Sequence, residues 1–176
     1  QVGRLVYYMT ENRPPPAPGE DLVITARVVE TLAPILGVQL TWIVGLEGVE
    51  SRVRTSDTVA MVDDGTGGDA VAGDGLYTAV IPGTPLTPGK MVRWNVDAVD
   101  VTGQFSRAPL FPHPTDSPEY YGTMVQDPTF ETTLSVLYWF VDNIGASESR
   151  SGTRCSVFFL DQFYDNVNVH IRGGST

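Results

Sequence analysis

One short stretch of this chain gathers the side chains that could do chemistry. Residues 63–77 read Asp-Asp-Gly-Thr-Gly-Gly-Asp-Ala-Val-Ala-Gly-Asp-Gly-Leu-Tyr, so Asp64, Asp69 and Asp74 recur every five residues with glycines between them. Carboxylate oxygens are the ligands that Ca²⁺ prefers, and glycines allow a backbone to fold tightly enough to bring several together. The stretch therefore predicts a calcium site made by Asp63, Asp64, Asp69 and Asp74.

A simpler interpretation of the same stretch is a turn whose aspartates cap their own backbone. It is not an EF-hand, whose ligands alternate along a loop that closes with a Glu at position twelve. Evenly spaced carboxylates at Asp64, Asp69 and Asp74 exceed what a turn needs, which favours calcium.

The elements around this stretch have the pattern of β-strands. Apolar runs broken by Gly, Pro and Asp recur at the spacing of about 8–12 residues that is typical of β-sandwiches. Alternation places Trp42 and Trp94 on the apolar faces of their strands, so we expect both in the core. The strands expected in the first part of the chain are Arg4–Met9, Asp21–Val29, Gly37–Val44, Thr58–Val62, Leu76–Pro82, Met91–Val99 and Phe105–Phe111.

A proline-rich run divides the chain. We expect a sandwich domain over 1–112, a linker over 113–118, and a β-rich segment over 119–176. Leu134–Val141 is a continuous apolar run typical of a strand buried on both faces, yet little of the chain remains to cover the far side of this sheet. The other elements expected here are strands at Tyr120–Gln126, Thr153–Leu160 and Gln162–Arg172 and a helical turn within 142–152. The fold class is thus mainly β, an Ig-like antiparallel β-sandwich followed by a smaller C-terminal β-rich (α+β fragment) segment.

Composition narrows the function classes. A net charge of −10 and a pI near 4.4 argue against nucleic-acid binding, which needs concentrated Lys and Arg. The acidic, Lys-poor composition favours an extracellular or cell-surface protein. No apolar run is long enough to span a membrane. Cys155 is the single cysteine and falls on the apolar face of a strand, so we expect a buried, inert thiol.

Two parts of the chain resemble known families. Residues 23–28 and 63–83, including the Asp/Gly stretch, resemble the Ig-like or fibronectin-type-III-like modules of large bacterial surface proteins. Such modules commonly precede a kinase-like domain of the spore-coat-protein-H (CotH) family. Residues 119–128, Trp139-Phe140 and 163–176 look like the start of that domain, and Arg172, Gly173 and Ser175 match its early Arg-Gly-x-Ser motif.

The resemblance also implies what a kinase of this family would need. A lysine after the Arg-Gly-x-Ser motif would hold the ATP phosphates, and later acidic residues would hold Mg²⁺ and activate the nucleophile. Phosphoryl transfer is mostly positioning and charge neutralisation, so these groups carry the chemistry. The only lysine is Lys90, far before the motif. We therefore expect the chain, as it stands, not to be an enzyme.

The leading hypothesis is a non-catalytic extracellular module, structural or adhesive, stabilised by calcium. Its C-terminal strand, Asn166–Arg172, would expose an unpaired edge through which copies could assemble into a filament or a surface layer. One alternative is the N-terminal fragment of a secreted protein kinase of the CotH type. The other is a carbohydrate-binding sandwich that stacks glycans on Tyr7, Tyr8, Tyr120 or Tyr121.

Overall fold

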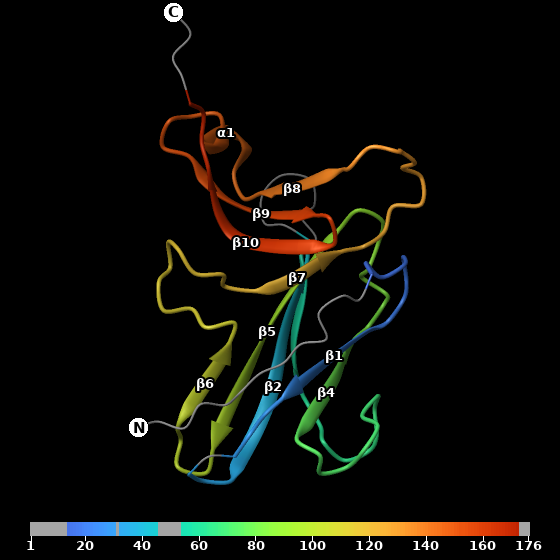
Figure 1. The fold of residues 1–176 in the computed structure, drawn as a ribbon, viewed down its shortest axis with the longest axis vertical. Helices are drawn as coiled ribbons and strands as arrows, with labels where there is room; N and C mark the ends of the chain where they lie inside the picture. Colours follow the sequence, from blue (N-terminus) through green and yellow to red (C-terminus); the bar gives the residue numbers. More distant parts are fainter. Residues whose placement is uncertain (1–13, 31, 46–53, 173–176) are drawn as a thin grey trace, which may run out of the picture.

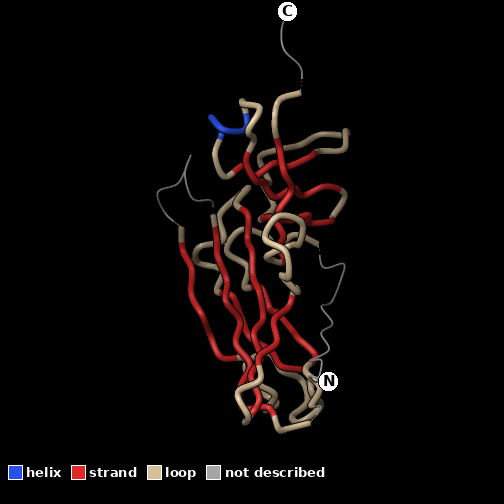
Figure 2. Tube along the Cα trace, turned by 90° about the vertical axis from the view of Figure 1, so that its left-hand side faces the viewer, coloured by secondary structure: helices blue, strands red, loops and turns tan. Residues whose placement is uncertain are grey.

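Antiparallel strands make up most of the structure, a computed structural model that describes residues 14–30, 32–45 and 54–172 (Figures 1 and 2). This confirms the mainly β fold class. The elements of the described residues are β1 (Leu22–Arg27), β2 (Ile35–Val44), β3 (Thr55–Ala60), β4 (Leu76–Ile81), β5 (Met91–Asp100), β6 (Phe105–Ala108), β7 (Tyr121–Met124), β8 (Leu137–Val141), α1 (Ile144–Ser147), β9 (Thr153–Phe159) and β10 (Gln162–Val169).

Two sheets form a sandwich-like unit. One has only β1 and β4; the other has the order β3-β2-β5-β6, with β7 also paired to β5. β6 and β7 share one edge of β5, because β6 pairs with Val96–Val99 and β7 pairs with Met91–Trp94. The edge strand is thus built in two pieces, and residues 109–120 leave the sheet between them.

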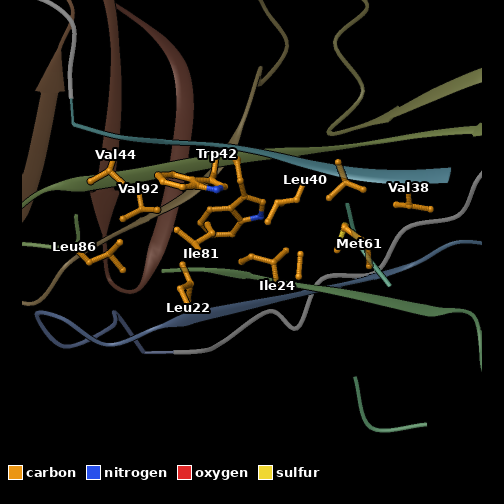
Figure 3. Packing of buried hydrophobic residues seen from close by; sticks show 14 of the residues in the cluster. Leu22, Ile24, Val38, Leu40, Trp42, Val44, Met61, Ile81, Leu86 and Val92 are labelled. Atoms are coloured by element: carbon orange, nitrogen blue, oxygen red, sulfur yellow. The ribbon is translucent and has the colours of Figure 1, made fainter. Parts of the chain in front are cut away.

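The core lies between these two sheets, where alternate residues of each strand point inward. Leu40 and Trp42 of β2 and Val92 of β5 face Leu22 and Ile81 from the opposite sheet (Figure 3). Trp42 and Trp94 are 3% and 4% exposed, so the prediction that both tryptophans are core residues is confirmed.

The predicted strands of the first domain agree with β1 to β6 to within a few residues at each end. The first of them, Arg4–Met9, lies outside the described residues. The strand predicted at Tyr120–Gln126 has an unexpected partner. As β7, it pairs with β5, so the sandwich continues past the expected linker at 113–118 and includes part of the expected C-terminal segment.

The remaining strands form a third sheet of order β10-β9-β8, which lies at the β7 end of the sandwich (Figure 1). Two adjacent residues of β10 hold it there. The Asp165 carboxylate accepts hydrogen bonds from the backbone N–H groups of Glu119 and Tyr120, both at 2.9 Å. The Asn166 amide donates to the carbonyls of Pro114 at 2.9 Å and Ser117 at 2.6 Å. The expected linker is therefore packed against β10.

Polar side chains line the outer face of β5 beneath this junction. The Arg93 and Arg107 guanidinium carbons lie 5.0 and 5.7 Å from the centre of the Tyr120 ring. Arg107 also donates to the Glu119 carbonyl at 3.0 Å. Burial raises the pKa of the Asp97 carboxyl, and the positive charge of Arg107 partly offsets that rise. Tyr120 thus covers charges that the sandwich would otherwise present to water.

The apolar run Leu134–Val141 was expected to be buried on both faces, and this prediction is wrong. Leu134 is 77% exposed, and within β8 Leu137 and Trp139 are 51% and 55% exposed. The reason is geometric. The sandwich covers only one face of the C-terminal sheet, and no described element covers this part of the other.

The core predicts a clear contrast between two leucines of β2. Leu40→Ala removes a fully buried side chain and leaves a cavity, so we expect the free energy of unfolding to fall by about 2–5 kcal/mol. Leu36→Ala is the matched control, because Leu36 is 67% exposed and should change stability by no more than about 0.5 kcal/mol. Denaturant titration of both variants checks the prediction. Equal losses would mean that the core is not where the structure puts it.

Candidate metal centre

The Asp/Gly stretch forms the connection from β3 to β4, at the end of the sandwich away from the C-terminal sheet (Figure 1). Its base is fixed by backbone pairing. Val62 and Thr78 exchange two hydrogen bonds, of 2.9 and 2.8 Å. The Val28 N–H, just after β1, donates to the Gly75 carbonyl at 2.9 Å. The loop is thus anchored on both strands of the smaller sheet.

Three of the four predicted ligands come together. Asp63, Asp69 and Asp74 each offer a carboxylate oxygen, and these oxygens lie within 4.8 Å of one another. Ca²⁺ binds oxygens at about 2.3–2.6 Å, so two of its ligands can be up to about 5 Å apart. The spacing therefore suits a single cation bound between the three carboxylates.

Asp63 is the structural centre of the loop. One of its oxygens accepts from the N–H groups of Gly73 at 2.7 Å and Asp74 at 3.1 Å, and the other accepts from Gly75 at 2.9 Å. These consecutive N–H groups converge because Gly73 and Gly75 have φ of 75° and 83°, in the left-handed region that favours glycine. The backbone itself wraps this carboxylate.

Each of the other two carboxylates of the triad also caps the backbone with one oxygen. Asp69, only 8% exposed, accepts from the Gly65 N–H at 2.6 Å. Asp74 accepts from the Leu76 N–H at 2.8 Å. Among the described residues these bonds use a single oxygen of each of the two aspartates, so the second oxygen of each can bind a ligand.

Asp64 lies apart from the triad. One of its oxygens accepts from the N–H of Thr66 at 2.9 Å and from its hydroxyl at 2.7 Å, which makes a local turn. Both interpretations of the sequence therefore describe part of the loop. All four aspartates cap backbone N–H groups, and three of them also converge.

The loop concentrates negative charge beside the sheet. The pKa of the Tyr77 hydroxyl is raised by burial first, and then by the negative charges of Asp63 and Glu30. A cation bound between the carboxylates would offset this field.

The other residues that the sequence singled out lie outside the Asp/Gly loop. Cys155 is buried, as expected. Burial raises the pKa of the Cys155 thiol, so the reactive thiolate is disfavoured. Of the tyrosines considered for glycan stacking, Tyr120 is half-buried against Arg93 and Arg107. Tyr121 packs against the core. Tyr7 and Tyr8 lie outside the described residues.

The residues of the kinase-like motif are only partly described. Arg172 is exposed just after β10, whereas Gly173 and Ser175 lie outside the described residues. No helix among the described residues is long and apolar enough to cross a membrane. Comparison with protein-family models finds no match, and comparison with curated proteins finds none either.

The contacts of Asp63 predict that this residue stabilises the loop without any metal. In the presence of a chelator, Asp63→Ala should lower the free energy of unfolding by at least about 1.5 kcal/mol, because three backbone N–H groups lose a charged acceptor. Asp64→Ala is the control in the same loop. It loses only contacts to Thr66 and should cost less. A larger loss for Asp64→Ala in chemical denaturation would contradict this ranking.

Proposed function

We propose that this chain is a non-catalytic, calcium-stabilised structural or adhesive module of an extracellular or cell-surface protein. The observation that carries the proposal is the convergence of Asp63, Asp69 and Asp74 at one end of a β-sandwich. The resemblance of the sandwich to Ig-like modules of bacterial surface proteins points in the same direction.

Calcium would act here as a clip between parts of the loop that are distant in sequence. Asp63 follows Val62, which pairs with β4, whereas Asp69 sits mid-loop and Asp74 just precedes β4. One cation held by all three would fix the whole connection and relieve the repulsion between their charges. We expect a dissociation constant on the order of 10⁻⁴–10⁻³ M, typical of extracellular calcium modules.

Self-association through the C-terminal sheet is the second part of the proposal. β10 pairs with β9 on one side, and no described strand pairs with its other side. An open sheet edge is a template for another chain, which supports assembly of copies into a filament or a surface layer. The CotH-type kinase fragment stays an alternative hypothesis.

Calcium should stabilise the folded chain in proportion to its occupancy of the triad. With the dissociation constant above, 10 mM Ca²⁺ should add about 1.4–2.7 kcal/mol to the free energy of unfolding. For a chain of this length, the melting temperature should rise by about 3–10 °C relative to chelator. Differential scanning calorimetry measures the shift, and Mg²⁺ at the same concentration controls for ionic strength.

Two variants with the same change of charge locate the site. Asp74→Asn keeps an oxygen for the Leu76 N–H and removes one charged ligand, so it should lose most of the calcium-dependent shift. Asp64→Asn lies outside the triad and should keep it. A wild-type shift no larger with Ca²⁺ than with Mg²⁺, or equal responses of the two variants, would refute the calcium site.

A further inference from the structure

A β-bulge interrupts β10 where this strand meets the sandwich. Two of its residues, Asp165 and Asn166, lie opposite the single residue Ser156 of β9, because the register shifts between Tyr164 and Val167. Asn166 has a φ of 60°, in the left-handed region that residues other than glycine seldom adopt. In a bulge the extra residue bends the strand and re-aims a side chain.

The bulge turns two consecutive side chains toward the sandwich. In a regular strand, neighbouring side chains point to opposite faces of the sheet. Here the Asp165 carboxylate accepts from two backbone N–H groups of residues 114–120, and the Asn166 amide donates to two backbone carbonyls of the same segment. The bulge therefore lets two adjacent residues bind one segment.

The segment that receives these bonds has a turn of its own, between β6 and β7 of the larger sheet. The N–H groups of Asp116 and Ser117 donate to the His113 carbonyl at 3.2 and 3.0 Å. The His113 N–H donates to the Ser117 hydroxyl at 3.2 Å. The turn thus fixes the carbonyls that Asn166 binds, and the receiving site belongs to the sandwich.

Asp165 connects this site to its own sheet. One carboxylate oxygen accepts from the two N–H groups of the sandwich segment, and the other accepts from the Ser156 hydroxyl of β9 at 2.8 Å. Hydrogen bonds to an ionised carboxylate are stronger than those between neutral groups. A single side chain therefore ties β9 and β10 to the segment before β7.

The sandwich has a core that does not depend on the C-terminal sheet. As far as the structure describes the chain, the buried apolar cluster of the sandwich includes no residue of β8, β9 or β10. Among the described residues of those three strands, only Cys155, Ser156 and Phe158 are buried. So small a sheet needs support from packing against another element. The contacts at the junction thus matter to the C-terminal sheet more than to the sandwich.

The amino-acid pattern of β10 does not fix its register beyond the bulge. Residues 166–169 read Asn-Val-Asn-Val, so two registers one residue apart each keep the valines on one face and the asparagines on the other. In the observed register Val167 lies opposite Cys155. Without the bulge, Val167 would lie opposite Arg154, and residues 166–169 would all change face. Contacts outside the strand must select between these registers.

We propose that Asp165 and Asn166 form a latch that couples docking of the C-terminal sheet to the register of β10. While the sheet is docked, the bonds from Asn166 to the 114–120 segment hold its left-handed backbone and keep the bulge. When they are lost, β10 pairs with β9 without the bulge, the two side chains no longer face the sandwich together, and the sheet is released. The latch is a two-state element that depends on neither the calcium site nor self-association.

Native-state hydrogen exchange of the whole chain tests the latch. Asn166→Gly removes the amide but still allows a positive φ, so it separates the latch from the local preference of the backbone. The amides of Glu119 and Tyr120, which donate to Asp165, should exchange at least about tenfold faster, while those of β2 and β5 keep their rates. Asn168→Gly is the matched control on the same strand, because Asn168 is exposed, and should leave both amides unchanged.

Two results would overturn the latch. If exchange at Glu119 and Tyr120 is unchanged or slower in Asn166→Gly, the left-handed backbone alone sets the bulge and the amide has no part in docking. If the amides of β5 exchange faster by the same factor, the sandwich and the C-terminal sheet open as one unit, and there is no separate release.

Nuclear Overhauser contacts between β9 and β10 test the second register. Asn166→Thr removes the amide, and its β-branched side chain resists a positive φ. The cross-strand contacts of Val167 should be to Cys155 in wild type and should move to Arg154 in the variant. Retention of the Val167–Cys155 contact, or loss of all contacts between the two strands, would contradict the two-register switch.

Discussion

β5 is paired along both of its edges, and most of the structure depends on this pairing. It takes β2 on one side and both β6 and β7 on the other. One of its faces supplies Val92, Trp94 and Val96 to the core. The other supplies Arg93, which lies against Tyr120 at the junction with the C-terminal sheet, and Asp97, which lies beside Arg107. A single strand therefore contributes both to the core of the sandwich and to the contacts between the sandwich and the C-terminal sheet.

Two parts of the sandwich solve opposite electrostatic problems. In the β3–β4 loop, Asp63, Asp69 and Asp74 collect negative charge that backbone N–H groups partly offset. On the outer face of the larger sheet, charges of both signs are brought together. The side-chain nitrogen of Asn95 donates to the Asp97 carboxylate at 3.2 Å, and its side-chain oxygen accepts from the Arg107 guanidinium at 3.2 Å.

Local pattern predicts much of this fold and little of its long-range pairing. Alternation of apolar residues located the strands and placed Trp42 and Trp94 in the core. Nothing in Tyr121–Met124 indicates that it pairs with β5, because strand pairing is decided by contacts distant in sequence. Asp165 and Asn166 likewise contact residues more than forty positions away, so no motif could reveal them.

At the candidate metal site, too, the sequence predicted the local features but not the contacts that depend on the folded backbone. The glycines and aspartates of residues 63–77 indicated a loop in which aspartates gather, but the even spacing of Asp64, Asp69 and Asp74 did not identify which ones, because Asp64 lies outside the triad. Which of the adjacent residues Asp63 and Asp64 joins the group depends on the left-handed glycines at Gly73 and Gly75, whose backbone turns N–H groups toward Asp63. The exposure of Trp139 could not be predicted either, because a continuous apolar run does not show which face of the strand is covered.

The two-piece edge strand has a mechanical consequence. The C-terminal sheet is tethered to the sandwich by the chain that leaves β7, and it is also held by the segment that precedes β7, through Asp165 and Asn166. A body attached at two separate points cannot swing freely about either of them. A pulling force applied to the C-terminal sheet would therefore be shared between the backbone pairing of β7 with β5 and these side-chain contacts.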